Sequence, residues 1–332
     1  MTTEPIHAAP SPTVTVLICA YTERRWDQLV AAVGSAATQT CLPTQIVLVI
    51  DHNPALLERA LHAFTDVDVV ANRYTSGLSG ARNTGVDDAR GDVIAFLDDD
   101  ARADRDWLAR LVSPYVDESV VGTGGVARAA WPDQRPSWFP PEFDWVVGCS
   151  YRGLPTSESP IRNPIGANMS FRRSAFAAAG GFQTDFGRVG TLPLGCEETE
   201  FSIRLRTIVP EARIVHVPGA TVDHFVSVDR VEVGYFLRRC VAEGLSKAAV
   251  TAHVGREQGL ASERAYVTRA LPSGFLMGLL PGRSDGGWHP TRSAMIVAGL
   301  VATTLGYAMG RLGMAGIAAR LAAAPAPRPT GR

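Results

Sequence analysis

Three consecutive carboxylates, Asp98, Asp99 and Asp100, directly follow the apolar run 93–97. Packing gives no reason to place them at the tip of a buried strand, because grouped like charges repel unless a positive group joins them. Alternate side chains of a strand share a face, so Asp98 and Asp100 are expected to point the same way. Carboxylate oxygens suit Mg²⁺ or Mn²⁺, with phosphate oxygens completing the shell. The pattern predicts a cation site for a diphosphate; a solvated acidic turn or a helix cap is the alternative.

Apolar runs alternate with helical patterns through the first hundred residues. The predicted strands are 14–20, 45–50, 67–71 and 92–97, and the predicted helices are 25–37, 55–64 and 77–89. Strands that are apolar on both faces and alternate with helices indicate a parallel sheet of β-α-β units. Ligands of such sheets bind beyond the carboxyl ends of the strands. The polar segments 21–23, 51–53 and 98–100 are therefore expected on one rim.

Composition narrows the classes of function. The 332 residues include 32 basic and 33 acidic side chains, and this balance disfavours a nucleic-acid partner. The five cysteines are scattered and form no Cys-x-x-Cys pair, which suits a reducing compartment. Residues 1–11 contain no apolar core of signal-peptide length. We therefore expect a cytoplasmic catalytic part, and the single lysine among many arginines indicates a GC-rich genome.

The last quarter of the chain is apolar. Residues 293–310 are uncharged and barely long enough to span a bilayer, and 276–280 form a second apolar patch. Three interpretations remain open: a single span, a helix lying on a membrane or docking surface, and an ordinary core helix. Membrane association fits better than full solubility, which favours a peripheral contact at the inner face of the cell membrane.

The middle of the chain is less regular. Strands are predicted at 120–127 and 166–172, and a helix opened by acidic residues at 196–208. Segment 131–151 is rich in proline and aromatic residues, which is typical of a packed wall or flap. Aromatic faces also stack on sugar rings, so Trp145 is a candidate acceptor contact.

Seven short motifs occur in an order that resembles glycosyltransferase family 2. They are 14–23, 47–51, 77–85, 96–100, Gly180-Gly181-Phe182, 195–200 and Asp223-His224. The resemblance covers roughly residues 13–247 and implies an α/β GT-A fold, with a Rossmann-like, mostly parallel sheet flanked by helices and followed by a C-terminal helical extension. The domains expected are a disordered N-terminus over 1–12, a GT-A domain over 13–250, a helical and membrane-associated extension over 251–320, and a disordered tail over 321–332.

The resemblance also implies roles for residues at the strand ends. Asp51 is expected to accept the N3–H of a uracil-type base, Asp100 to bind a Mg²⁺ or Mn²⁺ ion directly, and Asp98 to contact the donor sugar or ribose as well as the metal. His224 resembles a histidine that completes the metal shell in some members. The residues expected to bind the nucleotide donor are Ala20, Tyr21, Glu23, Asp51, Ser79, Arg82, Asp98 and Asp99.

The acidic pair of the family corresponds here to Glu197-Glu198, with glutamate where aspartate is frequent. Glu198 is the predicted catalytic base, which removes the proton of the acceptor hydroxyl; Glu197 or Glu200 is the alternative. Acidic residues also favour the first turn of a helix for electrostatic reasons alone. Further expected acceptor or phosphate contacts are Glu197, Trp145, Asn168, Arg238 and Arg239, of which the two arginines could equally lie on a plain surface helix.

Together with the resemblance, these features predict metal-dependent, inverting transfer of a sugar from a nucleoside-diphosphate donor to a hydroxyl, and the family pattern implies that the donor is UDP-linked. The expected acceptor is a cell-surface polysaccharide or a lipid-linked glycan, of actinobacterial type. One alternative is a sugar-nucleotide nucleotidyltransferase, but the glycine-rich loop of that class is missing from 20–25. The other is a sugar-nucleotide-binding protein without catalysis, which the joint presence of metal carboxylates and an acidic pair disfavours.

Overall fold

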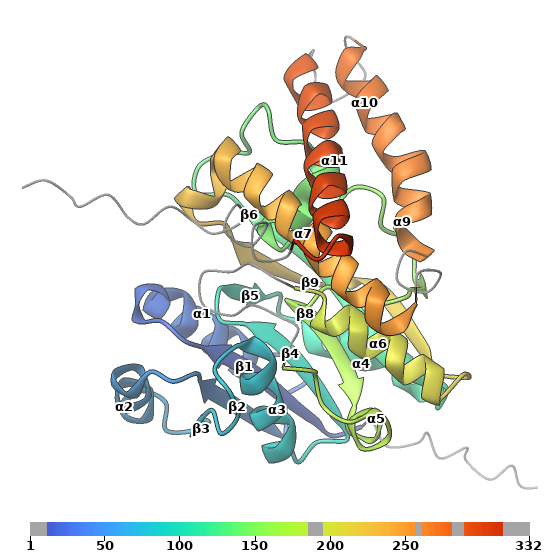
Figure 1. The fold of residues 1–332 in the computed structure, drawn as a ribbon. Coiled ribbons are helices and arrows are strands. Elements are labelled where there is room, and N and C mark those ends of the chain that lie inside the picture. Colours follow the sequence, from blue (N-terminus) through green and yellow to red (C-terminus); the bar gives the residue numbers. More distant parts are fainter. Residues whose placement is uncertain (1–11, 185–194, 256–260, 281–288, 315–332) are drawn as a thin grey trace, which may run out of the picture.

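The computed structural model describes residues 12–184, 195–255, 261–280 and 289–314 (Figure 1). Apart from Pro12, the two segments expected to be disordered, 1–12 and 321–332, lie outside these residues. The strands are β1 Val14–Ala20, β2 Gln45–Ile50, β3 Asp68–Ala71, β4 Val93–Asp98, β5 Ala101–Ala103, β6 Val120–Ala130, β7 Ser159–Pro160, β8 Asn168–Arg172 and β9 Arg213–Phe225.

The α-helices are α1 Trp26–Ala37, α2 Pro54–Ala63, α3 Leu78–Asp88, α4 Trp107–Val112, α5 Arg173–Ala179, α6 Glu197–Ile208, α7 Val233–Val254, α9 Ala261–Ala265, α10 Leu271–Leu279 and α11 Pro290–Arg311. Four short 3-10 helices accompany them: η1 Glu23–Arg25, η2 Ser113–Val116, η3 Pro141–Val147 and η4 Val228–Val231. A π-helical turn, η5 Tyr266–Ala270, joins α9 to α10.

The strands form one sheet in the order β3-β2-β1-β4-β8-β6-β9-β5, with β7 also paired to β9. β1 to β4 pair in parallel, as the alternation of apolar runs predicts. β8 runs antiparallel to both of its neighbours, β4 and β6, so the sheet is parallel in its first half and mixed in its second. Periodicity alone did not reveal this reversal, because apolar strands look alike in sequence whichever way they run, and the segment between β6 and β8 contains no α-helix of regular pattern.

Both faces of the parallel half are buried. Val16 and Ile18 face the side covered by α1, α2 and α4, whereas Leu17 faces the side covered by α3, α5 and α6. On the second side, Phe176 and Phe201 stack with ring centroids 4.7 Å apart. Covering a strand on both faces explains the continuous apolar runs, and it fixes the direction in which each strand end points.

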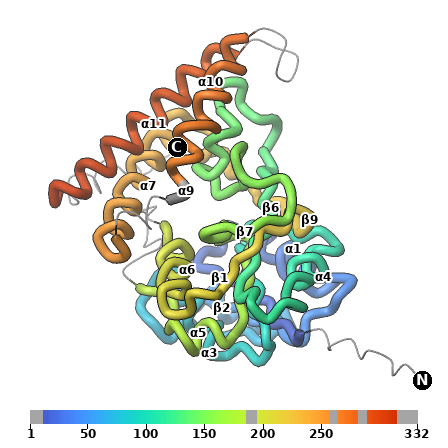
Figure 2. The backbone as a smooth tube through the Cα atoms, turned by 90° about the vertical axis from the view of Figure 1, so that its right-hand side faces the viewer, coloured from blue at the N-terminus to red at the C-terminus, as the bar shows by residue number. Residues whose placement is uncertain are grey.

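A second layer of helices, α7, α10 and α11, lies over one end of the sheet (Figures 1 and 2). The aromatic segment 131–151 is the wall between the two, because Phe139 and Phe143 pack with Phe236 of α7. The structure thus shows this segment as a packed wall, one of the expected alternatives. α7 runs through residue 250, where the division between the two domains is expected.

α7 and α11 cross with their backbones in contact. A Cβ atom added to Gly244 would overlap the carbonyl oxygen of Thr303, and one added to Gly306 would overlap that of Val241. Any larger residue at either glycine would push the helices apart, and overpacking of this kind typically costs about 1–3 kcal/mol. The crossing therefore holds α11 directly against α7.

The outer side of α11 is apolar and exposed. Within the described residues this is the one helix that is long and apolar enough to cross a membrane, and 28% of its most apolar window is buried. Val297, Val301 and Leu305, spaced four residues apart, expose 48%, 51% and 56% of their surface. Such a stripe is unlike a fully buried core helix, one of the three alternatives, and leaves the other two open.

Candidate active site

A cavity of about 910 Å³ lies beyond the carboxyl ends of β1, β2 and β4. Tyr21, Asp51 and Asp98, which follow or end these strands, line it together, as the strand-end pattern predicts. The opposite side is lined by residues of α6, α7, α9 and η5. The volume lies at the upper end of the usual range for small-molecule sites, about 300–1,000 Å³, so the cavity is large enough for a nucleotide sugar.

Sheet register brings His224 to the aspartate triplet. β5 directly follows the triplet and pairs with β9 so that Ala101 lies opposite His224. The Nε2 atom of His224 is 3.2 Å from Oδ1 of Asp100 and 3.8 Å from Oδ2 of Asp98. One ligand atom from each of the three residues lies within 4.8 Å of the others. The predicted grouping of these side chains is therefore present.

Charge and burial act together on these groups. Burial disfavours charge on Asp100 and His224, but each stabilises the charge of its partner, so the pKa of Asp100 lies well below its usual value and that of His224 well above. Burial likewise opposes ionisation of Asp98, yet the hydrogen bond with His224 and the charge of Arg82 lower its pKa. Once a metal ion replaces the proton on Nε2 of His224, two ionised carboxylates and a neutral imidazole form a donor set that fits Mn²⁺ or Mg²⁺. In addition, Nδ1 of His224 is buried without a hydrogen-bond partner, as is Oδ2 of Asp99.

Two arginines that the motifs did not indicate also contact the triplet. Arg25 places Nη1 2.5 Å from Oδ2 of Asp100 and 3.1 Å from Oδ1 of Asp99. Arg230, from η4, lies 3.8 Å from Asp100. Burial and the charge of Asp100 raise the pKa of Asp99 to about 7. Arg25 adjoins the first motif and could have been noticed, whereas Arg230 reaches the site only through the fold.

Asp51 anchors the loop before α3 while lining the cavity. Its carboxylate accepts hydrogen bonds from the Gly77 backbone N–H at 2.9 Å and from the Asn72 amide at 2.6 Å. Gly77 has φ +132°, a backbone conformation that residues with a side chain rarely adopt. Two expected donor contacts, Glu23 and Ser79, do not line the cavity in this structure: Glu23 is exposed in η1, and Ser79 is buried in the first turn of α3.

Arg82, one of the expected donor contacts, lines the cavity and lies between two acidic groups. It is 2% exposed, with Nη1 2.7 Å from Glu197 and Nη2 3.5 Å from Asp98. Its Nη2 also donates to the carbonyl of Gly166 at 3.0 Å. In this structure Arg82 therefore forms an ion-pair bridge between the triplet and the acidic pair of α6.

Glu198 lines the cavity from the first turn of α6. Burial and the neighbouring charge of Glu197 raise its pKa to about 7. A carboxylate with this pKa can take up a proton near neutral pH, as a general base must. Glu200, one of the alternatives, is instead buried in the core, where it pairs with Arg204 at 2.7 Å. It cannot reach the cavity, and the structural interpretation applies to it.

Two other expected acceptor contacts also lie elsewhere. Asn168 is fully buried: its amide donates to two backbone carbonyls and its oxygen accepts from Trp107 Nε1 at 2.8 Å. These hydrogen bonds link β8 to α4, β6 and β9, and Asn168 does not line the cavity. Arg238 is also outside the cavity, whereas the adjacent Arg239 and the predicted Trp145 line it.

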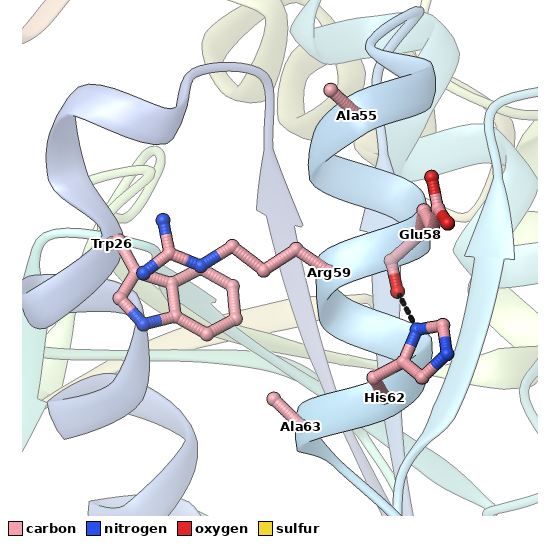
Figure 3. Close-up of a pocket in the computed structure, with 6 residues that line it drawn as sticks. All are labelled: Trp26, Ala55, Glu58, Arg59, His62 and Ala63. Carbon is pink, nitrogen blue, oxygen red and sulfur yellow. Dashed lines mark hydrogen bonds between the residues drawn. The ribbon is translucent and has the colours of Figure 1, made fainter.

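A second hollow of about 560 Å³ lies against α1 and α2 (Figure 3). In it the Arg59 guanidinium stacks on the ring of Trp26, 3.9 Å from the centroid, and His62 contacts the carbonyl of Glu58. These are ordinary surface contacts, and no group of three metal ligands lies there among the described residues. Among the described residues, the one group of three possible metal ligands lies in the larger cavity.

Comparison with known proteins agrees with this geometry. Residues 15–180 match the family model described as Glycosyl transferase family 2. The glucosyl-dolichyl phosphate glucuronosyltransferase of Haloferax volcanii is 34% identical over 238 residues, which make up 70% of this chain and 76% of that protein. The chain belongs to glycosyltransferase family 2. This family 2 enzyme is also 27% identical over 202 residues, 60% of each chain, to the succinoglycan biosynthesis protein ExoM of Rhizobium meliloti.

Solved glycosyltransferases share the fold of this family 2 enzyme. A mannosyltransferase of Pyrobaculum calidifontis in complex with GDP-Man and Mn²⁺ superposes with a TM-score of 0.52 at 19% identity, covering 96% of this chain and 90% of that one. GalNAc-T7 with UDP, GalNAc and Mn²⁺ superposes with a TM-score of 0.51 at 17% identity, covering 77% and 54%. The predicted GT-A fold with its C-terminal helices is confirmed. The protein is a glycosyltransferase.

Proposed function

We propose that this enzyme transfers a sugar from a UDP-linked donor to a hydroxyl of a lipid-linked or cell-surface glycan, with inversion at the anomeric carbon. One observation carries the proposal: the group of Asp98, Asp100 and His224 shares a cavity with Glu198, whose pKa is raised to about 7. The cavity thus combines a cation site, suited to a diphosphate, with a base suited to an acceptor.

The reaction is a single displacement. Glu198 takes the proton of the acceptor hydroxyl, the oxygen forms a bond to the anomeric carbon, and the bond from that carbon to the diphosphate oxygen breaks. The nucleoside diphosphate leaves with both electrons of that bond, and one displacement inverts the configuration. Asp98, Asp100 and His224 would hold the Mn²⁺ or Mg²⁺ ion, which supplies positive charge to the leaving diphosphate when bound.

Donor binding falls to the sheet side of the cavity. Ala20, Tyr21 and Asp51 line the part beyond β1 and β2, next to the triplet. Asp51 holds its carboxylate in place through the loop that it anchors, which supports its role as acceptor for the N3–H of uracil. Asp99 lies among the same groups and completes the donor side.

Membrane contact follows from the helical layer. The exposed apolar residues of α10 and α11 suit a bilayer surface, and the Haloferax relative is named for a dolichyl phosphate substrate. We assign the enzyme to the cytoplasmic face of the membrane, with residues 13–250 as the catalytic domain and 251–320 as the membrane-associated extension, in the synthesis of a surface glycan of actinobacterial type.

Thermal unfolding with UDP-, GDP- and dTDP-sugars, each with Mn²⁺ or Mg²⁺, tests the donor assignment. A bound ligand raises the melting temperature, so we expect the largest rise with a UDP-sugar and metal together. When the matching donor and a prenyl-phosphate glycoside are used as substrates, NMR should show that the transferred sugar in the product has the anomeric configuration opposite to that in the donor. Pyrophosphate release from UTP and a sugar 1-phosphate would indicate the nucleotidyltransferase alternative, and donor binding without release of UDP would indicate a binding protein.

A further inference from the structure

Five charged side chains form a network on the helical side of the cavity. Lys247, the one lysine of the sequence, lies 2.7 Å from Glu263 and 3.5 Å from Glu243. Arg162 contacts the other side of Glu263 at 2.9 Å, and Arg239 contacts Glu243 at 3.1 Å. All five line the cavity. Among the described residues, three cations contact two carboxylates in this network, so cations outnumber carboxylates by one.

This network lies next to the proposed base. The Sγ atom of Cys196, two residues before Glu198, is 3.6 Å from Glu243. The backbone N–H of Gly195 donates to the Ser246 hydroxyl of α7 at 3.2 Å. Beside burial and the charge of Glu197, Glu243 also contributes to the raised pKa of Glu198. The network is therefore on the acceptor side of Glu198, while the aspartate triplet belongs to the donor side.

Apolar and aromatic groups continue the cavity beyond the network. Tyr151 and Tyr266 pack edge to face with centroids 5.2 Å apart, and the Trp145 indole donates to the Tyr266 hydroxyl at 3.0 Å. Leu271 of α10 and Leu300 of α11 also line the cavity. One wall thus combines a base, a positively charged region and an apolar region that leads to the exposed hairpin of α10 and α11.

Resting on the proposed function, we propose that Arg162, Lys247 and Arg239 bind the phosphate of an amphiphilic acceptor. Its hydroxyl lies at Glu198 and its chain lies along Leu271 and Leu300. Guanidinium and ammonium groups form strong, charge-assisted hydrogen bonds with phosphate oxygens. A phosphate group brings negative charge to a network in which, among the described residues, cations outnumber carboxylates. Lys247 has the central place, because it contacts both carboxylates.

Binding of farnesyl phosphate, farnesol and inorganic phosphate to the full chain, with UDP and Mn²⁺ present at saturation, tests this subsite. We expect farnesyl phosphate to bind at least tenfold more tightly than either of the other two. Lys247→Met should lower that affinity at least tenfold and leave farnesol and UDP binding within twofold, and Lys247→Arg should restore most of it. Arg238→Gln, next to Arg239 but outside the cavity, is the matched control and should change nothing.

Equal affinities for farnesyl phosphate and farnesol would overturn the subsite. So would a Lys247→Met variant that loses affinity for farnesyl phosphate and for farnesol to the same extent. If Lys247→Met does not fold, as judged by circular dichroism, Arg239→Gln replaces it with the same expectation. Preferential binding of inorganic phosphate would also refute the amphiphilic acceptor. Failure of UDP to bind with Mn²⁺ would instead count against the donor assignment. The comparisons of farnesyl phosphate with farnesol and with inorganic phosphate can be made without UDP, so the two failures can be told apart.

Discussion

The two walls of the cavity differ in charge and in origin. The sheet wall is acidic and comes from short, contiguous motifs at strand ends, such as Asp98 to Asp100. The helical wall carries cations and aromatic rings from Tyr151, Arg162, α7 and η5, which are far apart in the sequence. The difference shows that the side chains of the proposed donor side lie in short motifs, whereas those of the proposed acceptor side come together only when α7 and the later helices pack against the sheet.

The largest effect is expected on the sheet wall, from Asp100→Asn. The amide keeps the shape of the side chain but removes an anionic ligand, so transfer should fall at least about 10³-fold and the metal-dependent rise in melting temperature should disappear. Asp66→Asn, at an exposed turn, is the control. If the variant keeps both its activity and its metal-dependent rise in melting temperature, Asp100 is not a metal ligand.

The second largest effect is expected from Glu198→Gln, a variant at the residue proposed as the base, which lies between the two walls. Loss of the base should lower kcat about 10²- to 10⁴-fold, with UDP-sugar binding within twofold. The pKa of Glu198 is raised from 4.5 to about 7, so its contribution to stability is complete below the lower value and is lost as the pH rises through the upper one. At pH 8 the variant should therefore unfold no earlier than the parent.

Glu200→Gln is the matched comparison for that variant. Because Glu200 is buried against Arg204, its replacement should lower the melting temperature and leave kcat of the folded protein near the parental value. If the two variants exchanged these outcomes, the base would have to be reassigned to Glu200.

The outer surface of the helical wall is tested by replacing Val301 and Leu305 with serine together. Removal of exposed apolar surface should weaken binding to vesicles of phosphatidylglycerol and phosphatidylcholine about tenfold or more. Transfer to a water-soluble acceptor should stay within twofold, because neither residue lines the cavity. Thr304→Ser on the same helix is the control, and unchanged vesicle binding in the double variant would contradict a membrane contact through α11.

The smallest effect is a shift in a pH profile. Glu197 raises the pKa of Glu198 through its negative charge, so Glu197→Gln should lower that pKa. The acidic limb of kcat/KM, with a midpoint near 7 in the parent, should then move to lower pH. An unchanged midpoint in a folded, active variant would show that another group controls the limb.

The sequence predicted the sheet wall well because its groups follow apolar strands directly. The positions of Asp51, the triplet and the acidic pair needed only strand ends and motif order. The same reasoning misplaced Asn168, Glu23 and Ser79, since a polar side chain near a motif can equally satisfy hydrogen bonds in the core or face the solvent.

The helical wall was largely missed for a physical reason. Lys247 and Glu263 belong to no motif, and they meet Arg162 only because α7 and α9 fold back over the sheet. Of the adjacent arginines 238 and 239, only the second faces the cavity. Which of two neighbours on a helix points inward depends on the partner surface, and a single sequence does not specify that surface.

The glycine crossing of α7 and α11 has a geometric consequence. α7 carries Arg239 and Lys247 into the cavity, and α11 carries the exposed apolar stripe outward. Gly244 and Gly306 leave no layer of side chains between the helices, so the two backbones are in direct contact. If α11 binds a bilayer as proposed, this contact would fix the distance between the lipid surface and Glu198, and we expect that distance to limit how far an acceptor hydroxyl can lie from its lipid anchor.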